Sequence, residues 1–347
     1  MGNRLFKNKN KNENKEKGAE EQKNREETEE ECVVERGEVK KIEEDVKKRN
    51  YKLTLIKKKY APDIFCIASF PCGNILISQK QSVIKIYDEN FNQIQIIENA
   101  CEKWIYRVAA IDNNNFATVS YNGQLRTFTK KKGTELFKLN QIIPVFEEWM
   151  DNLIVTKRKD IITNSWGGDE IKIYSLGFNN KYKLSASLKI NGKRILCADD
   201  YKLLIISNTY ETYFYNLYTY KLLKKLGGVG TNDKYSLFRI DNDRIVACNY
   251  GRIKVICLNK KGVIATIEGF APNIGCNVDG KGIFLCARET FIWVFRSDLL
   301  VCIQIIEPYR DTIYGIFCHK SGIIMCYSLR VSDFQIYKIE EEKENEQ

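Results

Sequence analysis

Short runs of alternating apolar and polar residues recur about every 40 residues between Tyr51 and Ile339. Alternation with a period of two is the pattern of half-buried β-strands. Gly, Asn and Asp separate the runs, and little sustained helical periodicity occurs among them. The runs fall into seven groups, which open near Ile64, Trp104, Asn152, Arg194, Tyr235, Ile274 and Ile313. This repeat predicts an all-β chain of similar units.

Six of the groups contain four runs, and the group that opens at Ile313 contains three. In the first group the runs are Ile64–Phe70, Asn74–Gln79, Val83–Asp88 and Ile94–Glu98. Units of about 40–45 residues with four strands are typical of β-propeller blades. The alternating segment Tyr51–Lys57 precedes the first group and can supply the missing strand, because pairing the two ends of the chain removes open sheet edges. We therefore predict a seven-bladed β-propeller whose last blade is closed by an N-terminal strand.

The first group resembles a WD40 repeat in its second and third strands. Residues 71–78 read PCGNILIS and residues 83–88 read VIKIYD, with Tyr87-Asp88 where Trp-Asp is usual in that family. Residues 170–175 and 252–257 are similar third strands. The Gly-His dipeptide of the family is missing, and Cys101 stands where its His would be expected. The usual histidine network between strands therefore cannot form, and we expect packing of strand aliphatics to hold the blades together.

The chain divides by composition into three parts. Residues 1–50 form a charged arm that we expect to be disordered or weakly helical, residues 51–339 form the WD40-like propeller, and residues 340–347 form an acidic tail. Acidic and basic side chains balance within residues 1–50, so the formal net charge of +10 belongs to the rest of the chain.

Composition also excludes several classes of function. His319 is the single histidine, and the 12 cysteines include no Cys-x-x-Cys pair, so we expect no metal site and no cofactor. No apolar run is long enough to span a membrane, and no secretory signal opens the chain. These features favour a soluble, cytoplasmic protein with free, mostly buried cysteines, and a disulfide framework is the alternative.

Aromatic residues follow the second strand of several groups, where the resemblance implies a protein-binding face. Such rings supply contact area with few rotamers to immobilise, which suits interface anchors. Packing of each ring over its own hairpin is the alternative. The candidate partner-binding residues are Tyr121, Trp166, Tyr210 and Tyr250 after second strands, with Trp104 and Tyr309 near the turns that enter a blade.

The resemblance implies a non-enzymatic scaffold or adaptor that binds other proteins, with a monomeric propeller. No pair of acids or nucleophile with a base can be assigned, so catalysis is not expected; an enzyme or small-ligand binder using the central channel is the alternative. Lysine clusters such as Lys57-Lys58-Lys59 and Lys130-Lys131-Lys132 leave binding of RNA or anionic lipid open. Gly2 could be myristoylated and anchor the chain to a membrane, although Phe6 stands where that motif needs Ser or Thr.

Overall fold

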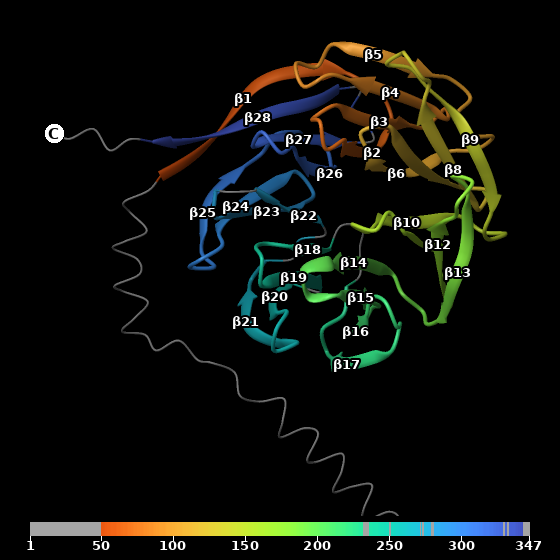
Figure 1. The fold of residues 1–347 in the computed structure, drawn as a ribbon. Coiled ribbons are helices and arrows are strands. Elements are labelled where there is room, and N and C mark those ends of the chain that lie inside the picture. Colours follow the sequence, from red (N-terminus) through yellow and green to blue (C-terminus); the bar gives the residue numbers. More distant parts are fainter. Residues whose placement is uncertain are drawn as a thin grey trace, which may run out of the picture.

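The computed structural model describes residues 50–231, 236–249, 251–270, 272, 274–278, 281–328, 330–331 and 333–342. In this part of the chain, strands β1–β28 form seven four-stranded antiparallel sheets. The sheets are arranged as blades around a central axis (Figure 1). The prediction of a seven-bladed β-propeller is confirmed. The expectations for the arm before Asn50, for the Gly2 anchor and for the tail after Glu342 lie outside the described residues.

Each blade begins with its innermost strand, and these strands begin within two residues of the predicted openings. Blade 1 contains β2 (Ile64–Ser69), β3 (Ile75–Gln79), β4 (Val83–Tyr87) and β5 (Gln93–Ile97). Blade 2 contains β6 (Ile105–Asp112), β7 (Asn115–Ser120), β8 (Gln124–Lys130) and β9 (Phe137–Pro144). Blade 3 contains β10 (Met150–Val155), β11 (Ile161–Ser165), β12 (Glu170–Leu176) and β13 (Tyr182–Lys189).

The remaining blades follow the same order around the ring. Blade 4 contains β14 (Arg194–Ala198), β15 (Leu203–Ser207), β16 (Glu211–Asn216) and β17 (Leu222–Gly227). Blade 5 contains β18 (Leu237–Arg239), β19 (Arg244–Asn249), β20 (Arg252–Cys257) and β21 (Gly262–Glu268). Blade 6 contains β22 (Ile274–Val278), β23 (Ile283–Arg288), β24 (Phe291–Arg296) and β25 (Cys302–Ile306). Blade 7 contains β26 (Ile313–Cys318), β27 (Ile323–Ser328), β28 (Asp333–Glu342) and β1 (Asn50–Tyr60).

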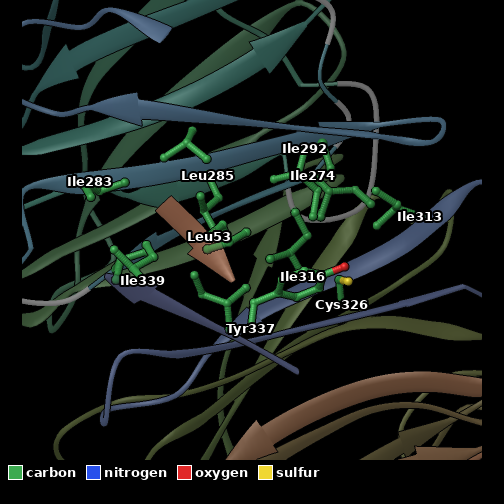
Figure 2. Close-up of a cluster of buried hydrophobic side chains, with 14 of the residues drawn as sticks. Leu53, Ile274, Ile283, Leu285, Ile292, Ile313, Ile316, Cys326, Tyr337 and Ile339 are labelled. Atoms are coloured by element: carbon green, nitrogen blue, oxygen red, sulfur yellow. The ribbon is translucent and has the colours of Figure 1, made fainter. Parts of the chain in front are cut away.

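The N-terminal strand closes the ring as the sequence predicted. β1 pairs antiparallel with β28, with Leu53 opposite Ile339 and Tyr60 opposite Asp333 (Figure 1). The Leu53 side chain is buried in the cluster that joins blades 6 and 7, near Leu285 of blade 6 (Figure 2). Its backbone N–H donates to Gln304 Oε1 of blade 6 over 3.1 Å. Both strands run past their predicted boundaries. β1 extends from Asn50 to Tyr60, and β28 continues to Glu342 in the expected tail.

Buried apolar clusters lie between neighbouring blades rather than at the centre of the ring. Leu76 and Ile84 of blade 1 pack with Ile105 and Phe116 of blade 2, and an equivalent cluster joins each other neighbouring pair. Burying a side chain of this size contributes about 1.5–3 kcal/mol. Strand aliphatics therefore pack between the blades as expected, and aromatic side chains, which were not part of that expectation, join them.

The single histidine forms a second connection where the ring closes. His319 lies in the β26–β27 turn of blade 7 and is buried. Its Nε2 lies 2.8 Å from the carbonyl oxygen of Gly73 in blade 1, and its Nδ1 lies 2.7 Å from Ser321 Oγ. Gly73 has φ +107°, and a Cβ there would lie 2.9 Å from Lys320 Cε, so glycine suits the position.

Helical structure is minimal in the described ranges. Asp199–Tyr201 forms one 3₁₀ turn, η1, between β14 and β15. No helix in this part of the chain is both long enough and apolar enough to cross a lipid bilayer.

The cysteines of the described residues are all free thiols. Cys66, Cys101, Cys248, Cys286 and Cys326 are buried, and Cys72 is exposed. Burial raises the pKa of the Cys286 thiol, so this group stays protonated at neutral pH. These thiols pack as small apolar side chains rather than forming a disulfide framework.

Candidate functional site

Four consecutive blades share a bulge near the start of the innermost strand. In blades 7, 1, 2 and 3 the register between the first two strands shifts by one residue directly after the first paired residue. The residue left out of the pairing is the second of the strand: Tyr314, Phe65, Tyr106 and Asp151, respectively. A bulge turns its extra residue away from the regular alternation of the strand, and it often does so beside a binding site. All four of these side chains line one cavity.

The cavity lies at the mouth of the central channel and has a volume of about 550 Å³. Most of its wall is aromatic, and Asp151 and Arg194 contribute its main buried charges. Asp63 and Lys80 lie on its rim and also line a second cavity of about 290 Å³ beside β1. A concave apolar wall with a few polar groups is the usual form of a binding site.

Four half-exposed rings form a continuous row above this cavity, and we call them the aromatic ladder: Trp104, Tyr121, Trp149 and Trp166. Their side chains are 37–48 % exposed. Successive ring centroids are 5.9 Å (Trp104–Tyr121), 5.3 Å (Tyr121–Trp149) and 5.6 Å (Trp149–Trp166) apart. Aromatic pairs at such separations attract each other and restrict each other's rotation.

Equivalent positions in blades 2 and 3 supply the ladder in pairs. Trp104 and Trp149 directly precede β6 and β10, and Tyr121 and Trp166 directly follow β7 and β11. The N–H of Tyr121 donates to the Trp104 carbonyl oxygen over 2.8 Å, and the N–H of Trp166 donates to that of Trp149 over 2.7 Å. Each pair is therefore held by a backbone bond at the end of its hairpin. In blade 1 the equivalent positions are Asp63 and Lys80, and the N–H of Lys80 donates to the Asp63 carbonyl oxygen over 3.0 Å.

Rings from the bulges support the ladder from below. Tyr106 lies 6.3 Å from Tyr121 and 5.8 Å from Trp149 between ring centroids, and Phe65 lies 6.0 Å from Trp104. Burial, with smaller contributions from neighbouring tyrosines and Asp151, raises the pKa of Tyr106 to about 12. The Tyr106 hydroxyl is consequently a neutral hydrogen-bond donor at physiological pH.

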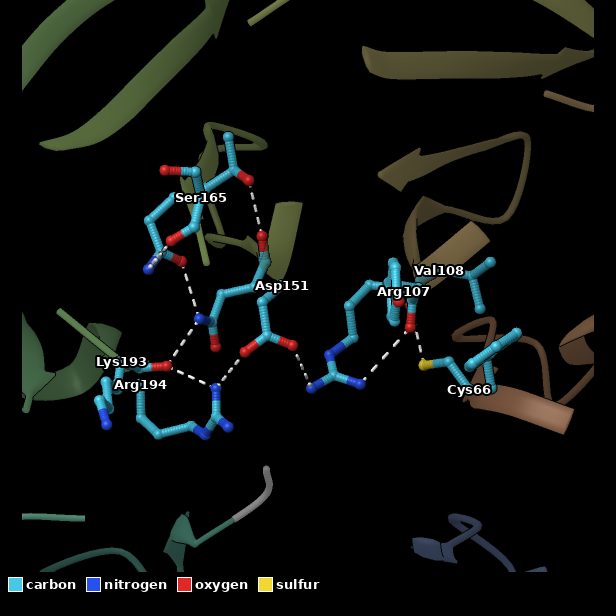
Figure 3. Close-up of polar contacts among 12 residues, drawn as sticks. Cys66, Arg107, Val108, Asp151, Ser165, Lys193 and Arg194 are labelled. Atoms are coloured by element: carbon cyan, nitrogen blue, oxygen red, sulfur yellow. Dashed lines mark hydrogen bonds and ion pairs between the residues drawn. The ribbon is translucent and has the colours of Figure 1, made fainter. Parts of the chain in front are cut away.

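Three charged side chains from neighbouring inner strands meet beneath the aromatic wall. Asp151 Oδ1 lies 3.6 Å from Arg107 Nη2, and Asp151 Oδ2 lies 2.5 Å from Arg194 Nη1 (Figure 3). All three side chains are at least nine-tenths buried. A buried ion pair gains little net stability but strongly disfavours other arrangements, since separating it leaves uncompensated charge. The triad therefore orients the inner strands of blades 2, 3 and 4 relative to each other.

A neutral network continues from this triad along β10. The amide Nδ2 of Asn152 donates to Asn164 Oδ1 over 2.7 Å and to the Lys193 carbonyl oxygen over 2.8 Å. Thr163 Oγ1 donates to the Asn152 carbonyl oxygen over 2.6 Å. These bonds satisfy buried polar groups and tie blade 3 to the segment entering blade 4.

Asp151 is the buried carboxylate of the cavity, and two guanidinium groups engage its oxygens. Among the described residues no cluster of His, Cys, Asp and Glu has a geometry that could hold a metal ion.

The structure brings together three of the six residues predicted to bind a partner, namely Trp104, Tyr121 and Trp166. Tyr210 lies after β15 of blade 4 and is 71 % exposed, but no ring contact joins it to the ladder in the part of the chain described. Tyr250 lies outside the described residues. Binding by any of these residues remains a prediction.

The prediction that Tyr309 lies exposed among the candidate partner-binding residues is wrong. This side chain is only 5 % exposed. Its hydroxyl donates to the Cys326 carbonyl oxygen over 2.8 Å and accepts from the Gln335 N–H over 3.0 Å. The hydrogen bonds between the Tyr309 hydroxyl and these backbone groups require the ring to point into blade 7. Tyr309 thus stabilises this blade from within.

Sequence reasoning missed Trp149 and the residues on the bulges. Trp149 was detectable, because it precedes its inner strand just as Trp104 precedes β6. Phe65, Tyr106, Asp151 and Tyr314 are the second residues of their strands, but the openings predicted near Trp104 and Asn152 concealed this equivalence in blades 2 and 3. The sequence analysis also did not identify the charged triad, whose members stand on three different blades.

Comparison with known proteins adds no family to this description. The sequence matches no protein-family model and no curated protein. The seven-bladed propeller is shown by the structure, and the resemblance to WD40 repeats rests mainly on the motif residues of blade 1.

Proposed function

We propose that this chain is a non-enzymatic interaction scaffold that binds a protein partner with its aromatic ladder. The observation that carries the proposal is the contiguous row of half-exposed rings above an aromatic cavity. Clustered Trp and Tyr side chains are enriched among the residues that dominate binding energy at protein interfaces. The fold supports this function only generally, since propellers serve many roles.

Pre-organisation of the site supports the same conclusion. The ladder is held by backbone bonds at each hairpin, by ring contacts and by the bulged rings beneath it. A rigid surface loses little conformational entropy on binding, so more of the contact energy appears as affinity.

Quantitative affinity purification with the full chain tests this function. A Trp104→Ala, Trp149→Ala, Trp166→Ala variant should lose specific partners that the unaltered chain captures. Tyr210→Ala is the matched control, because it removes an exposed ring of blade 4 outside the ladder. Identical sets of captured proteins for the triple variant and the unaltered chain would exclude the ladder as the partner-binding surface.

A small-ligand binder is a second candidate, and the 550 Å³ cavity favours it specifically. Ligand pockets commonly have volumes of about 300–1,000 Å³. Ligand-observed NMR with a library of aromatic fragments would detect such binding. A fragment that binds the unaltered chain and not a Tyr106→Ala variant would support this candidate.

Binding of RNA or anionic lipid has less support from the described residues. Several lysines of the basic clusters form ion pairs: Lys130 with Glu135, Lys157 with Asp200, Lys159 with Asp112 and Lys225 with Glu211. These carboxylates offset part of the local positive charge. Strongly salt-dependent binding of RNA or of anionic vesicles would restore this candidate.

A further inference from the structure

The loops that present the aromatic ladder are acidic, although the chain as a whole is basic. Segments 98–104, 121–123, 145–149 and 166–170 contain one basic residue, Lys103, and six acidic residues: Glu98, Glu102, Glu147, Glu148, Asp169 and Glu170. The formal net charge of the chain is +10. These segments therefore carry a net negative charge, although the basic side chains of Lys80, Arg126, Lys172 and Lys189 lie beside them.

Four of these carboxylates face solvent without an ion-pair partner among the residues that the structure describes. Glu102 pairs with Arg126 at 3.4 Å, and Glu170 pairs with Lys189 at 3.3 Å. Glu98, Glu147, Glu148 and Asp169 are exposed and form no ion pair with any residue in the described ranges. Glu147 and Glu148 directly precede Trp149, and Asp169 follows Trp166 by three residues.

Rings at this site already accept cations from the chain itself. Lys80 Nζ lies 5.4 Å from the Trp104 ring centroid, and Lys172 Nζ lies 4.4 Å from that of Phe146. The face of an aromatic ring attracts cations through its quadrupole, most strongly for Trp. The Trp149 and Trp166 rings lie next to the unpaired carboxylates and have no such cation from the described residues.

We propose that the aromatic ladder binds a lysine- or arginine-bearing segment of a partner protein. The cationic groups bind at the solvent-exposed parts of the Trp149 and Trp166 rings, which stack on each other, and Glu147, Glu148 and Asp169 supply the complementary charge. The aliphatic part of each basic side chain packs on the neighbouring rings. Arg194 and Arg107 are held beneath the cavity by Asp151, so the cations bind at the ladder and not at the cavity floor. This inference rests on the proposed function and adds the charge of the partner to it.

Titration of the full chain with two synthetic peptides tests this proposal. In one peptide arginine alternates with alanine, and in the other glutamate alternates with alanine. The arginine peptide should bind and change tryptophan fluorescence, with affinity that falls as salt is added. The glutamate peptide should not bind. Equal binding of both peptides, or binding of neither, would overturn the proposal.

Charge reversal locates the binding. A Glu147→Lys, Glu148→Lys, Asp169→Lys variant should bind the arginine peptide about tenfold more weakly or worse. The matched control is Glu268→Lys, Glu289→Lys, Glu307→Lys, which makes the same change in net charge at blades 5 and 6. Unchanged melting temperatures show that both variants fold. An equal loss in both variants would overturn the assignment to the ladder, because only the net charge would then matter.

Two further variants separate the possible outcomes. Lys80→Ala removes the cation that lies on Trp104 and should tighten binding of the arginine peptide, whereas weaker binding would contradict a cationic ligand.

The chain's own basic residues Arg4, Lys7, Lys9 and Lys11 can be replaced together by Gln. Binding that appears only after this replacement would assign the ladder to the chain's own arm and overturn the role of a partner. If the ladder variants lose partner capture while the arginine peptide does not bind, the proposed function stands and the inference about charge fails.

Discussion

Blades 7, 1, 2 and 3 form a bulged arc of the propeller, and blades 4, 5 and 6 form a regular arc. In the regular arc the second residue of the inner strand keeps its pairing, as at Ile195 and Phe238, and packs between blades. In the bulged arc the same position carries residues such as Tyr106 and Asp151, which line the cavity instead. Because side chains alternate between the two faces of a strand, one extra residue moves the side chain from one environment to the other. A shift of one residue thus separates strands whose second residue packs between blades from strands whose second residue lines the cavity.

The largest expected effect concerns β1, the strand that completes blade 7 of the bulged arc. Deleting residues 1–59 removes the pairing of β1 with β28 and the burial of Leu53, whereas deleting residues 1–49 leaves both intact. Loss of a buried leucine alone costs about 2–5 kcal/mol, so the longer deletion should lower the free energy of unfolding by at least about 5 kcal/mol. Chemical denaturation measures this difference. Equal stabilities for the two truncations would show that β1 does not hold blade 7 closed.

The charged triad at the end of the bulged arc should give the next largest effect. Asp151→Ala leaves Arg107 and Arg194 buried without their shared carboxylate, and we expect a loss of about 3–5 kcal/mol in urea denaturation. Asp169→Ala is the control, because this exposed carboxylate forms no ion pair within the described ranges, and its effect should stay within about 0.5 kcal/mol. Similar losses for both variants would argue against a structural role for the triad.

Removing a bulge should convert one blade of the bulged arc to the regular type. Deletion of Tyr106 lets β6 pair with β7 without the shift at its start, at an expected cost of about 1–3 kcal/mol. The far-ultraviolet circular dichroism of the propeller should persist, while the near-ultraviolet signal of the ladder changes and partner capture falls. Retained capture at full strength would show that the bulge does not position the ladder.

The smallest expected effect is on the way the stability of the fold changes with pH in the alkaline range. The pKa of Tyr106 is raised from 10.0 to about 12, first by burial and then by Tyr314, Tyr121 and Asp151. The folded state thus holds this proton more tightly than the unfolded chain. The stabilisation is complete below about pH 10 and is lost as the pH rises through about 12. Tyr106→Phe should make the fall in melting temperature over this interval shallower, and an unchanged slope would contradict the shift.

The strands and their grouping were predictable because they depend on local alternation. The seven openings and the closing strand before Ile64 follow from the period of the sequence, and the structure confirms them. Trp104, Tyr121 and Trp166 were also predictable, since a ring at a turn between two strands lies at the end of a hairpin. Tyr309 shows the limit of that reasoning, because its backbone partners Cys326 and Gln335 are on other strands.

The sequence by itself determined that this chain forms a ring of four-stranded blades closed by its own N-terminal strand, because alternation and repeat length are properties of the chain. Only the tertiary structure decided which blades carry the site. Trp104, Trp149 and Trp166 meet because neighbouring blades place equivalent turns side by side, and Tyr106 and Asp151 reach the cavity because each occupies a bulge. Both effects arise from pairing and packing between different strands and turns, which the alternation within one strand does not encode.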